Sequence, residues 1–263
     1  MSASVTSAPT ILAHLSDPHV RAGPGDGGAS AALAAAVAAV LGLEPEPDAV
    51  IVTGDIADTA AAGEYDRAQE LLAPLPMPVH VLPGNHDDRD ALRERFGPAG
   101  AGGPGGPLRY AVACGRFRLV LCDSTVPGED GGQADADSCA WLERRLDEEP
   151  ETPTIVAMHH PPLLTGVPDL DAIGVPEADR AALASILGRA PQVRLVVGGH
   201  VHRAVFSTLG GCGVVACPST HLLARLEIGK GMLELVPEAP AFAVHVALGD
   251  ELVSHVQPVT TAA

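Results

Sequence analysis

Residues 49–55 read AVIVTGD, and this apolar run, which ends abruptly at Gly54 and Asp55, decides the fold class. A short continuous run of apolar and β-branched residues is typical of a strand buried in a parallel sheet. Similar runs occupy residues 10–16, 79–82, 117–122, 154–158 and 193–197. Helix-like segments at 30–43, 64–72, 90–96, 136–148 and 177–187 alternate with them, and Ser30 is expected to cap the first helix. This alternation predicts an α/β fold.

The pattern changes after His202. Strand-like runs at 205–209, 214–217, 242–247 and 251–256 are joined by tight turns, which predicts an antiparallel or mixed part of the sheet. The Gly/Pro-rich residues 97–106 predict a flexible surface loop and not a domain linker, because strand-like runs continue on both sides. We therefore expect one domain over residues 1–263.

The charge balance limits the partners. The 263 residues include 33 Asp and Glu against 16 Lys and Arg, a formal net charge of −17. Nucleic-acid polymers and anionic membranes are therefore not expected as partners, because both require a basic face. The start MSASVTSAPT has no signal-peptide pattern and no apolar run reaches 18 residues, so we expect a cytoplasmic protein. Five scattered cysteines without a C-x-x-C pair predict reduced core thiols.

Five of the strand-like runs end in a turn that carries Asp, Asn or His. These turns read SDPH at 16–19, TGD at 53–55, PGNHD at 83–87, MHHPP at 158–162 and GGHVH at 198–202. Taken singly, Asp17 or Asp55 is an ordinary turn residue or cap, and Asn85 is a natural left-handed residue. Six of the eleven histidines lie in these turns, however. Because the carboxyl ends of parallel strands meet at one edge, we expect all five turns to converge on one site.

Carboxylate, imidazole and amide oxygen form a mixed ligand set that suits Mn, Fe or Zn, and the absence of a cysteine cluster excludes a structural zinc finger. Seven ligands are too many for one ion that keeps an open coordination position, whereas two ions that share one carboxylate use them all. Two such ions also make the local field positive, so an acidic protein can attract a phosphate. The seven candidate ligands are Asp17, His19, Asp55, Asn85, His159, His200 and His202.

The motifs D-x-H, G-D, G-N-H-D, H-H-P-P and G-H-x-H occur in this order between residues 14 and 202. This order resembles the calcineurin-like metallophosphoesterases, and within them the bacterial class III cyclic-nucleotide phosphodiesterases. The resemblance implies a four-layer α/β/β/α sandwich of two mixed sheets flanked by helices, with residues 203–263 completing the second sheet. It also implies a homodimer.

The resemblance further implies the role of each site residue. One metal would be held by Asp17, His19, Asp55 and His202, and the other by Asp55, Asn85, His159 and His200, with Asp55 bridging. His86 would act as the acid or the transition-state donor, so the catalytic residues would be His86 and Asp55. The expected substrate contacts are Asn85, His86, His202 and His221. The role of His160, and that of Glu129 and Asp130 where relatives often carry a histidine, stays open.

The implied function is hydrolysis of small phosphodiesters, cyclic nucleotides of the cAMP type among them, by in-line attack of a metal-bound hydroxide. A phosphomonoesterase or phosphoprotein phosphatase would use the same metals, and a non-catalytic scaffold would use the same fold. The acidic charge disfavours a nuclease. The GPGDGG stretch at 23–28 fits a dinucleotide-binding motif, but it starts too far from the strand end, and Pro24 lacks the backbone N–H that such a turn needs.

The other histidines have structural interpretations. We expect His14 to be a buried, hydrogen-bonded neighbour of the site, and His80 to lie in a strand. His245 and His255 are expected on the solvent side of the last hairpin, and Trp141 in the core.

Overall fold

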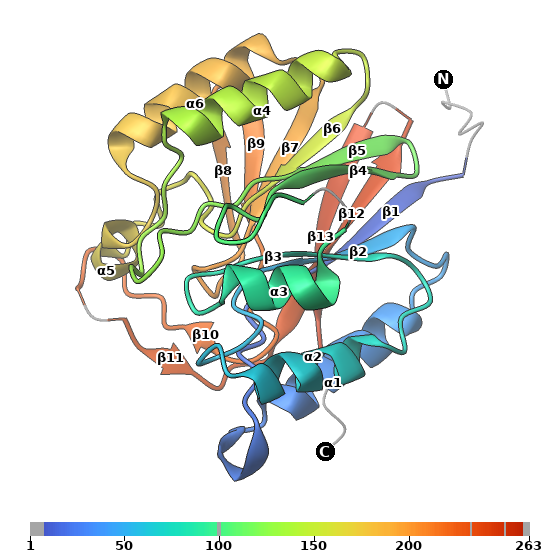
Figure 1. The fold of residues 1–263 in the computed structure, drawn as a ribbon, viewed down its shortest axis with the longest axis vertical. Coiled ribbons are helices and arrows are strands. Elements are labelled where there is room, and N and C mark those ends of the chain that lie inside the picture. Colours follow the sequence, from blue (N-terminus) through green and yellow to red (C-terminus); the bar gives the residue numbers. More distant parts are fainter. Residues whose placement is uncertain (1–7, 99–100, 232, 250, 260–263) are drawn as a thin grey trace.

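Two mixed β-sheets pack against each other and carry helices on their outer faces, as Figure 1 shows. This computed structural model describes residues 8–98, 101–231, 233–249 and 251–259. The arrangement is the predicted four-layer α/β/β/α sandwich.

The first sheet has five strands in the order β13-β12-β1-β2-β3. Strands β1, β2 and β3 are parallel, and β12 pairs with β1 in the antiparallel sense. Helices α1, α2 and α3 belong to this half of the molecule (Figure 1). Its elements are β1 (Thr10–Leu15), α1 (Ala29–Leu41), β2 (Ala49–Thr53), α2 (Ala62–Leu72), β3 (Val79–Leu82), α3 (Arg89–Phe96), β12 (Ala241–Leu248) and β13 (Glu251–Pro258).

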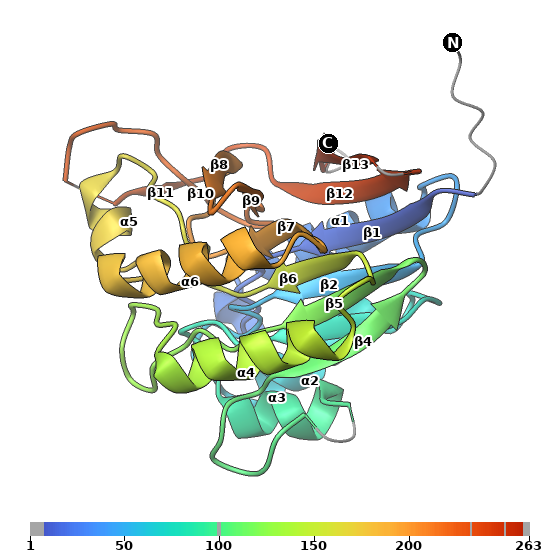
Figure 2. The same ribbon diagram turned by 90° about the horizontal axis from the view of Figure 1, so that it is seen from above.

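The second sheet has six strands in the order β4-β5-β6-β7-β9-β8. Helices α4 and α6 lie side by side along its outer face (Figure 2). Its elements are β4 (Tyr110–Cys114), β5 (Phe117–Leu121), α4 (Ala136–Glu148), β6 (Thr154–Ala157), α6 (Glu177–Arg189), β7 (Val193–Gly198), β8 (Val205–Leu209) and β9 (Cys212–Ala216). The short elements are the 3-10 turn at Gly23–Gly25, α5 (Pro168–Ala172), and the strand pair β10 (Leu223–Ala224) and β11 (Leu235–Val236).

The inner strands of the second sheet are buried on both faces. In β5, Leu119 and Leu121 pack into the core between the two sheets, whereas Val120 packs into the core under α4 and α6. Successive side chains of a strand point to opposite faces, so both faces must be apolar when both are covered. The continuous apolar runs of the sequence are explained by this double coverage.

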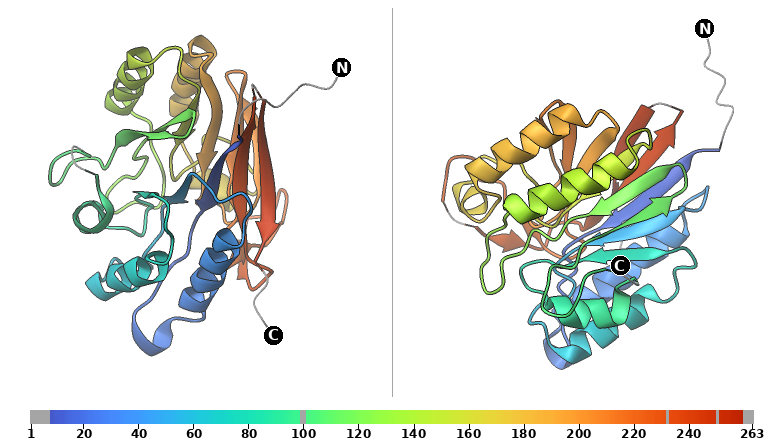
Figure 3. Two further views of the ribbon diagram at one scale, coloured as in Figure 1. Left: turned by 90° about the vertical axis from the view of Figure 1, so that its right-hand side faces the viewer. Right: turned by 45° about the horizontal axis from the view of Figure 1, so that its top comes forward.

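The last two strands correct one expectation. Strands β8 and β9 extend the second sheet, but β12 and β13 join the first sheet beside β1 (Figure 3). The expectation that residues 203–263 complete the second sheet is therefore wrong for this hairpin. Its strand β12 is buried along most of its length, and it pairs with β1 in a register that sets Ala13 opposite Val244. Because consecutive side chains of β12 are buried, both of its faces need the apolar residues that the sequence supplies.

Several smaller expectations can be compared with the structure. Helix α1 begins at Ala29, so Ser30 is not its cap; the Asp26 carboxylate accepts hydrogen bonds from the Ser30 N–H and hydroxyl instead. Residues 99 and 100 of the expected loop lie outside the described residues, and the described residues 101–106 form no helix or strand. All five cysteines are free thiols, as predicted, and all but the half-buried Cys139 are buried. Within the described ranges, no helix has the length and apolar character to cross a bilayer.

Candidate metal centre and active site

The five turns that follow β1, β2, β3, β6 and β7 meet at one end of the two sheets, as predicted. The His19 N–H donates to the Asp55 carbonyl at 2.9 Å, which joins the first two turns. The His86 N–H donates to Asp55 Oδ1 at 3.0 Å, which adds the third. The second sheet is connected by the His200 N–H, which donates to Asp17 Oδ1 at 3.0 Å.

The backbone of these turns is unusual. Five of the predicted ligands adopt φ angles between 45° and 64°, a left-handed conformation that residues with a Cβ rarely adopt. Such conformations cost about 1–3 kcal/mol each and cluster at functional sites. These five residues are Asp17, His19, Asp55, His200 and His202.

Two glycines allow the turns to approach one another. A Cβ on Gly84 would overlap the carboxylate and backbone nitrogen of Asp55, and a Cβ on Gly199 would overlap Ser16 and the carboxylate of Asp17. Any larger residue at either position would push a predicted ligand out of place.

The first group of donor atoms comes from Asp17, His19, Asp55 and His202, and these atoms all lie within 4.8 Å of one another. His19 Nε2 lies 3.4 Å from Asp55 Oδ2 and 3.1 Å from His202 Nε2. His202 Nε2 lies 3.6 Å from Asp17 Oδ1. The group is therefore compact enough to surround one ion.

The second group comes from Asp55, Asn85, His159 and His200. Asn85 Oδ1 lies 3.1 Å from both His159 Nε2 and His200 Nδ1. His159 Nε2 lies 3.5 Å from Asp55 Oδ2, the same oxygen that faces His19. Asp55 thus stands between the two groups, where the resemblance placed a bridging carboxylate.

Each of the four histidines in the two groups has an inner ring nitrogen, which faces the other donor atoms, and an outer ring nitrogen, which faces away from them. The outer nitrogen of each ring contacts an oxygen acceptor. Such partners fix the ring orientation and tautomer of histidines that bind metals. The pairs are His202 Nδ1 with the Leu222 carbonyl at 2.7 Å, His159 Nδ1 with the Thr53 carbonyl at 2.7 Å, His200 Nε2 with the Ile173 carbonyl at 3.1 Å, and His19 Nδ1 with Asp58 Oδ1 at 3.2 Å.

This arrangement leaves lone pairs facing each other at the centre. An outer nitrogen that donates to a carbonyl carries the hydrogen, so the inner nitrogen of the neutral ring is an acceptor. The inner nitrogens of His19 and His202 nevertheless lie 3.1 Å apart, and both inner nitrogens of the second group face the Asn85 oxygen. A proton or a metal ion between such acceptors removes their repulsion. The residues present therefore fit a centre of metal ions that bind nitrogen and oxygen ligands.

Comparison with known proteins agrees with this geometry. The sequence matches the calcineurin-like phosphoesterases over residues 11–204. The chain belongs to this family.

Bacterial phosphodiesterases are similar to this phosphoesterase along most of its length. The glycerophosphodiester phosphodiesterase GpdQ of Enterobacter lignolyticus is 31% identical over 253 residues, which are 93% of this chain and 90% of that protein. The 3′,5′-cyclic adenosine monophosphate phosphodiesterase CpdA of Pseudomonas aeruginosa is 31% identical over 219 residues, 82% of this chain and 78% of that protein. In fold, the chain is similar to a dimetal phosphatase from Danio rerio, with a TM-score of 0.72, 17% identity, and coverage of 95% and 96% of the two chains.

The charges at the centre of the phosphoesterase depend on one another. Burial alone would raise the pKa of Asp55, but the adjacent positive charges of His159 and His19 hold it well below its usual value. Burial would lower the pKa of His159, but the Asp55 carboxylate outweighs burial and raises that pKa to about 9. Without metal, His159 therefore keeps a proton beside Asp55, and a bound metal ion would displace that proton.

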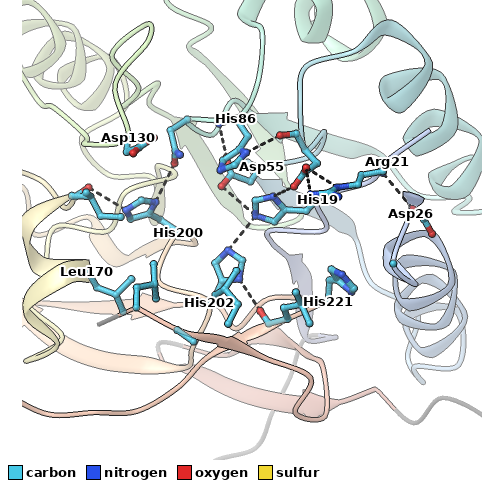
Figure 4. Close-up of a pocket in the computed structure, with 18 of the residues that line it drawn as sticks. His19, Arg21, Asp26, Asp55, His86, Asp130, Leu170, His200, His202 and His221 are labelled. Carbon is cyan, nitrogen blue, oxygen red and sulfur yellow. Dashed lines mark hydrogen bonds and ion pairs between the residues drawn. The ribbon is translucent and has the colours of Figure 1, made fainter. Parts of the chain in front are cut away.

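A cavity of about 560 Å³ opens over both groups of the phosphoesterase (Figure 4). His86 and His221, both predicted substrate contacts, line it. His86 Nδ1 donates to the Asp58 carbonyl at 2.8 Å, and its ring meets the His19 ring edge-on with 4.7 Å between centroids. Because Nδ1 is engaged, Nε2 of His86 is the nitrogen left for a substrate.

Two acidic residues in or near the quoted motifs, Asp58 and Asp87, have roles that the sequence did not reveal. Asp58 contacts His19 with its carboxylate and His86 with its carbonyl. Asp87 accepts hydrogen bonds from the N–H groups of Ile56, Ala57 and Gly84, and so ties the turn after β2 to the turn after β3. Burial and the charge of Asp55 raise the pKa of Asp87 to about 6. Asp58 stands three residues after Asp55, and Asp87 directly follows His86. These positions were the only signal in the sequence.

His160, whose role was open, lies beside His159 and His200, but both of its ring nitrogens have hydrogen-bond partners outside the ligand set. Nδ1 lies 2.9 Å from Ser124 Oγ, and Nε2 donates to the Asp130 carbonyl at 3.1 Å. This geometry favours His159 as the ligand of the pair. It also gives the loop that carries Glu129 and Asp130 a function, since the backbone carbonyl of Asp130 fixes the His160 ring.

The remaining histidine predictions have mixed outcomes. His14 is fully buried and hydrogen-bonded to Thr53, as predicted. The prediction that His245 faces solvent is wrong: it is buried, and its Nε2 lies 3.1 Å from His14 Nδ1. Consecutive residues of β12 are buried, so both of its faces are covered. His255 is exposed as expected, and Trp141 is half-buried against the core under α4 and α6.

Proposed function

We propose that this phosphoesterase hydrolyses small phosphodiesters at two metal ions, with cyclic nucleotides of the cAMP type as its substrates. One ion would be held by Asp17, His19, Asp55 and His202, and the other by Asp55, Asn85, His159 and His200. The observation that carries the proposal is the meeting of two sets of inward-facing acceptors at one shared carboxylate. The names of the bacterial relatives support the choice of phosphodiesters.

The ions, which we expect to be Mn, Fe or Zn, would supply positive charge to the phosphoryl group and lower the pKa of a water toward about 7. The chain supplies a proton donor and its position. The Asp55 carboxylate fixes the backbone of His86, and the Asp58 carbonyl fixes its ring. With Nδ1 engaged, the protonated form of His86 donates from Nε2 to the phosphoryl or leaving oxygen, a role that contributes about 10²–10⁴-fold in comparable enzymes.

The proposal is tested by hydrolysis assays on protein that has been chelated and reloaded with Mn²⁺. We expect turnover of cAMP and of bis(p-nitrophenyl) phosphate, little turnover of p-nitrophenyl phosphate, and loss of all activity in chelator. The substrate 2′,3′-cAMP should be included to separate the two cyclic classes. Faster hydrolysis of the monoester than of every diester would favour a phosphomonoesterase. The absence of any hydrolysis would favour the scaffold alternative.

The cytoplasmic location and the homodimer stay predictions. Sedimentation velocity of the metal-loaded chain tests the second, and fractionation of the producing cells tests the first.

A further inference from the structure

One side of the cavity is an apolar wall built from two segments far apart in the sequence. Leu170 of α5 and the following Ile173 form one part, and Leu222, Leu233 and Leu235, at and near β10 and β11, form the other. The Leu233 N–H donates to the Asp169 carboxylate at 2.8 Å, so the two segments are joined. In Figure 4, Leu170 lies below His200, on the side of His202 away from His221.

The wall is attached directly to the metal-binding groups. The Ile173 carbonyl accepts from His200, and the Leu222 carbonyl accepts from His202. The residues that orient one histidine of each group therefore also present apolar side chains to the cavity. A phosphate at the centre would place its organic substituent beside this wall.

The rest of the cavity rim is acidic. Asp26, Asp58 and Asp130 line it, and among the described lining residues Arg21 is the one Lys or Arg. Its guanidinium lies 2.6 Å from Asp58 Oδ2, so that cation is already paired. A second anionic group on the substrate would meet these carboxylates without a free basic partner.

We propose, on the basis of the proposed function, that the preferred substrates are singly charged phosphodiesters whose organic part beyond the phosphate is uncharged and largely apolar, and that the wall of Leu170, Ile173, Leu222, Leu233 and Leu235 binds this part. None of the five wall residues carries a ring, so their contact with the substrate is by aliphatic surface and not by ring stacking. The uncharged base of cAMP suits such a wall better than glycerol does.

A matched series of p-nitrophenyl alkyl phosphates tests this proposal on the Mn²⁺-loaded enzyme. In each, water supplies the new P–O bond, p-nitrophenolate leaves, and the alkyl phosphate remains. We expect kcat/KM to rise at least tenfold from the methyl to the butyl ester, since each buried methylene contributes up to about fourfold. Replacing butyl by 3-carboxypropyl should lower kcat/KM at least tenfold. Equal rates for methyl, butyl and carboxypropyl esters would overturn the proposal.

Two pairs of variants locate the effect. Leu235→Ala should reduce the butyl-to-methyl ratio at least threefold, whereas Leu248→Ala, whose leucine is equally exposed (41% against 42%) but outside the cavity, should leave it unchanged. Asp130→Asn should raise kcat/KM for the 3-carboxypropyl ester at least threefold, whereas the adjacent Glu129→Gln should leave it unchanged. An effect as large in the controls would also overturn the proposal.

The two proposals fail in different ways. Hydrolysis of all esters without dependence on the alkyl group refutes the wall and leaves the proposed function intact. No hydrolysis of these esters or of cAMP refutes both.

Discussion

Asp58→Asn should weaken metal binding without removing any ligand. In the folded protein, Asp58 Oδ1 lies 3.2 Å from His19 Nδ1, and Asp58 Oδ2 lies 2.6 Å from the Arg21 guanidinium. The hydrogen bond from His19, with the neighbouring positive charges, lowers the pKa of Asp58, so the carboxylate is ionised at neutral pH. This negative charge orients His19 and makes its inner nitrogen more basic.

The size of the effect follows from the burial of the pair. The side chains of His19 and Asp58 are only 11% and 15% exposed, so water screens their interaction weakly. A hydrogen bond to a charged group contributes about 1.5–3 kcal/mol, and the loss of such a partner typically costs 10–100-fold in metal affinity. We expect Asp58→Asn to raise the Kd for Mn²⁺ about tenfold or more, and Asp58→Ala to raise it further.

Calorimetric titration of chelated protein with Mn²⁺ measures this change. Asp66→Asn is the control, because Asp66 also pairs with an arginine, Arg95, but its side chain is 62% exposed. The control should bind Mn²⁺ like the wild type, since surface ion pairs contribute little. If Asp58→Asn also binds within twofold of the wild type, His19 is oriented without Asp58 and the reasoning is wrong.

Three further predictions concern the proton donor, a buried histidine and the stability of the loaded protein. His86→Gln should keep both metals by elemental analysis but lose about 100-fold or more in kcat, with the exposed His255→Gln as an unaffected control; normal turnover would remove His86 from catalysis. Burial lowers the pKa of His245 to about 4, so the native chain excludes a proton that the unfolded chain binds below pH 6.5. Denaturant titrations should therefore show about 3 kcal/mol of unfolding free energy lost between pH 6.5 and 4. The loss should be smaller in His245→Gln, and an equal loss in both proteins would contradict this. Mn²⁺ at 100 times its Kd should add about 2.7 kcal/mol and raise Tm by about 5–10 °C, reversibly with chelator, whereas an unchanged Tm would argue against a specific site.

The strands that carry the site could be predicted because their signals are local. The apolar run before Asp55 gives β2 with its observed bounds, and the same holds for β3 before Asn85. The chemistry of each turn is local as well, since the residue types and their spacing stand next to one another in the sequence. Convergence of the turns within each sheet then followed from the parallel arrangement of its strands, whereas the packing of the two sheets brings both sets together.

The remaining features depend on partners distant in the sequence. Alternation tells which face of a strand is apolar but not which sheet the strand joins, so the pairing of β12 with β1, and with it the burial of His245 beside His14, could not be predicted. Backbone carbonyls have no signature in the sequence, so the contacts that orient His200 and His202 were also invisible. The same is true of the left-handed turns, because Asp and His adopt φ > 0 only where the surrounding structure holds them.

The metal content of Asp55→Ala tests the central claim most directly. Wild type and variant would be chelated, reloaded with Mn²⁺, freed of excess metal, and analysed for ions per chain and for hydrolysis of bis(p-nitrophenyl) phosphate, with far-UV circular dichroism to confirm the fold. Because Asp55 belongs to both groups of donors, we predict two ions and turnover in the wild type, and neither in the variant. A folded Asp55→Ala protein that keeps two ions and hydrolyses the diester normally would contradict the shared centre.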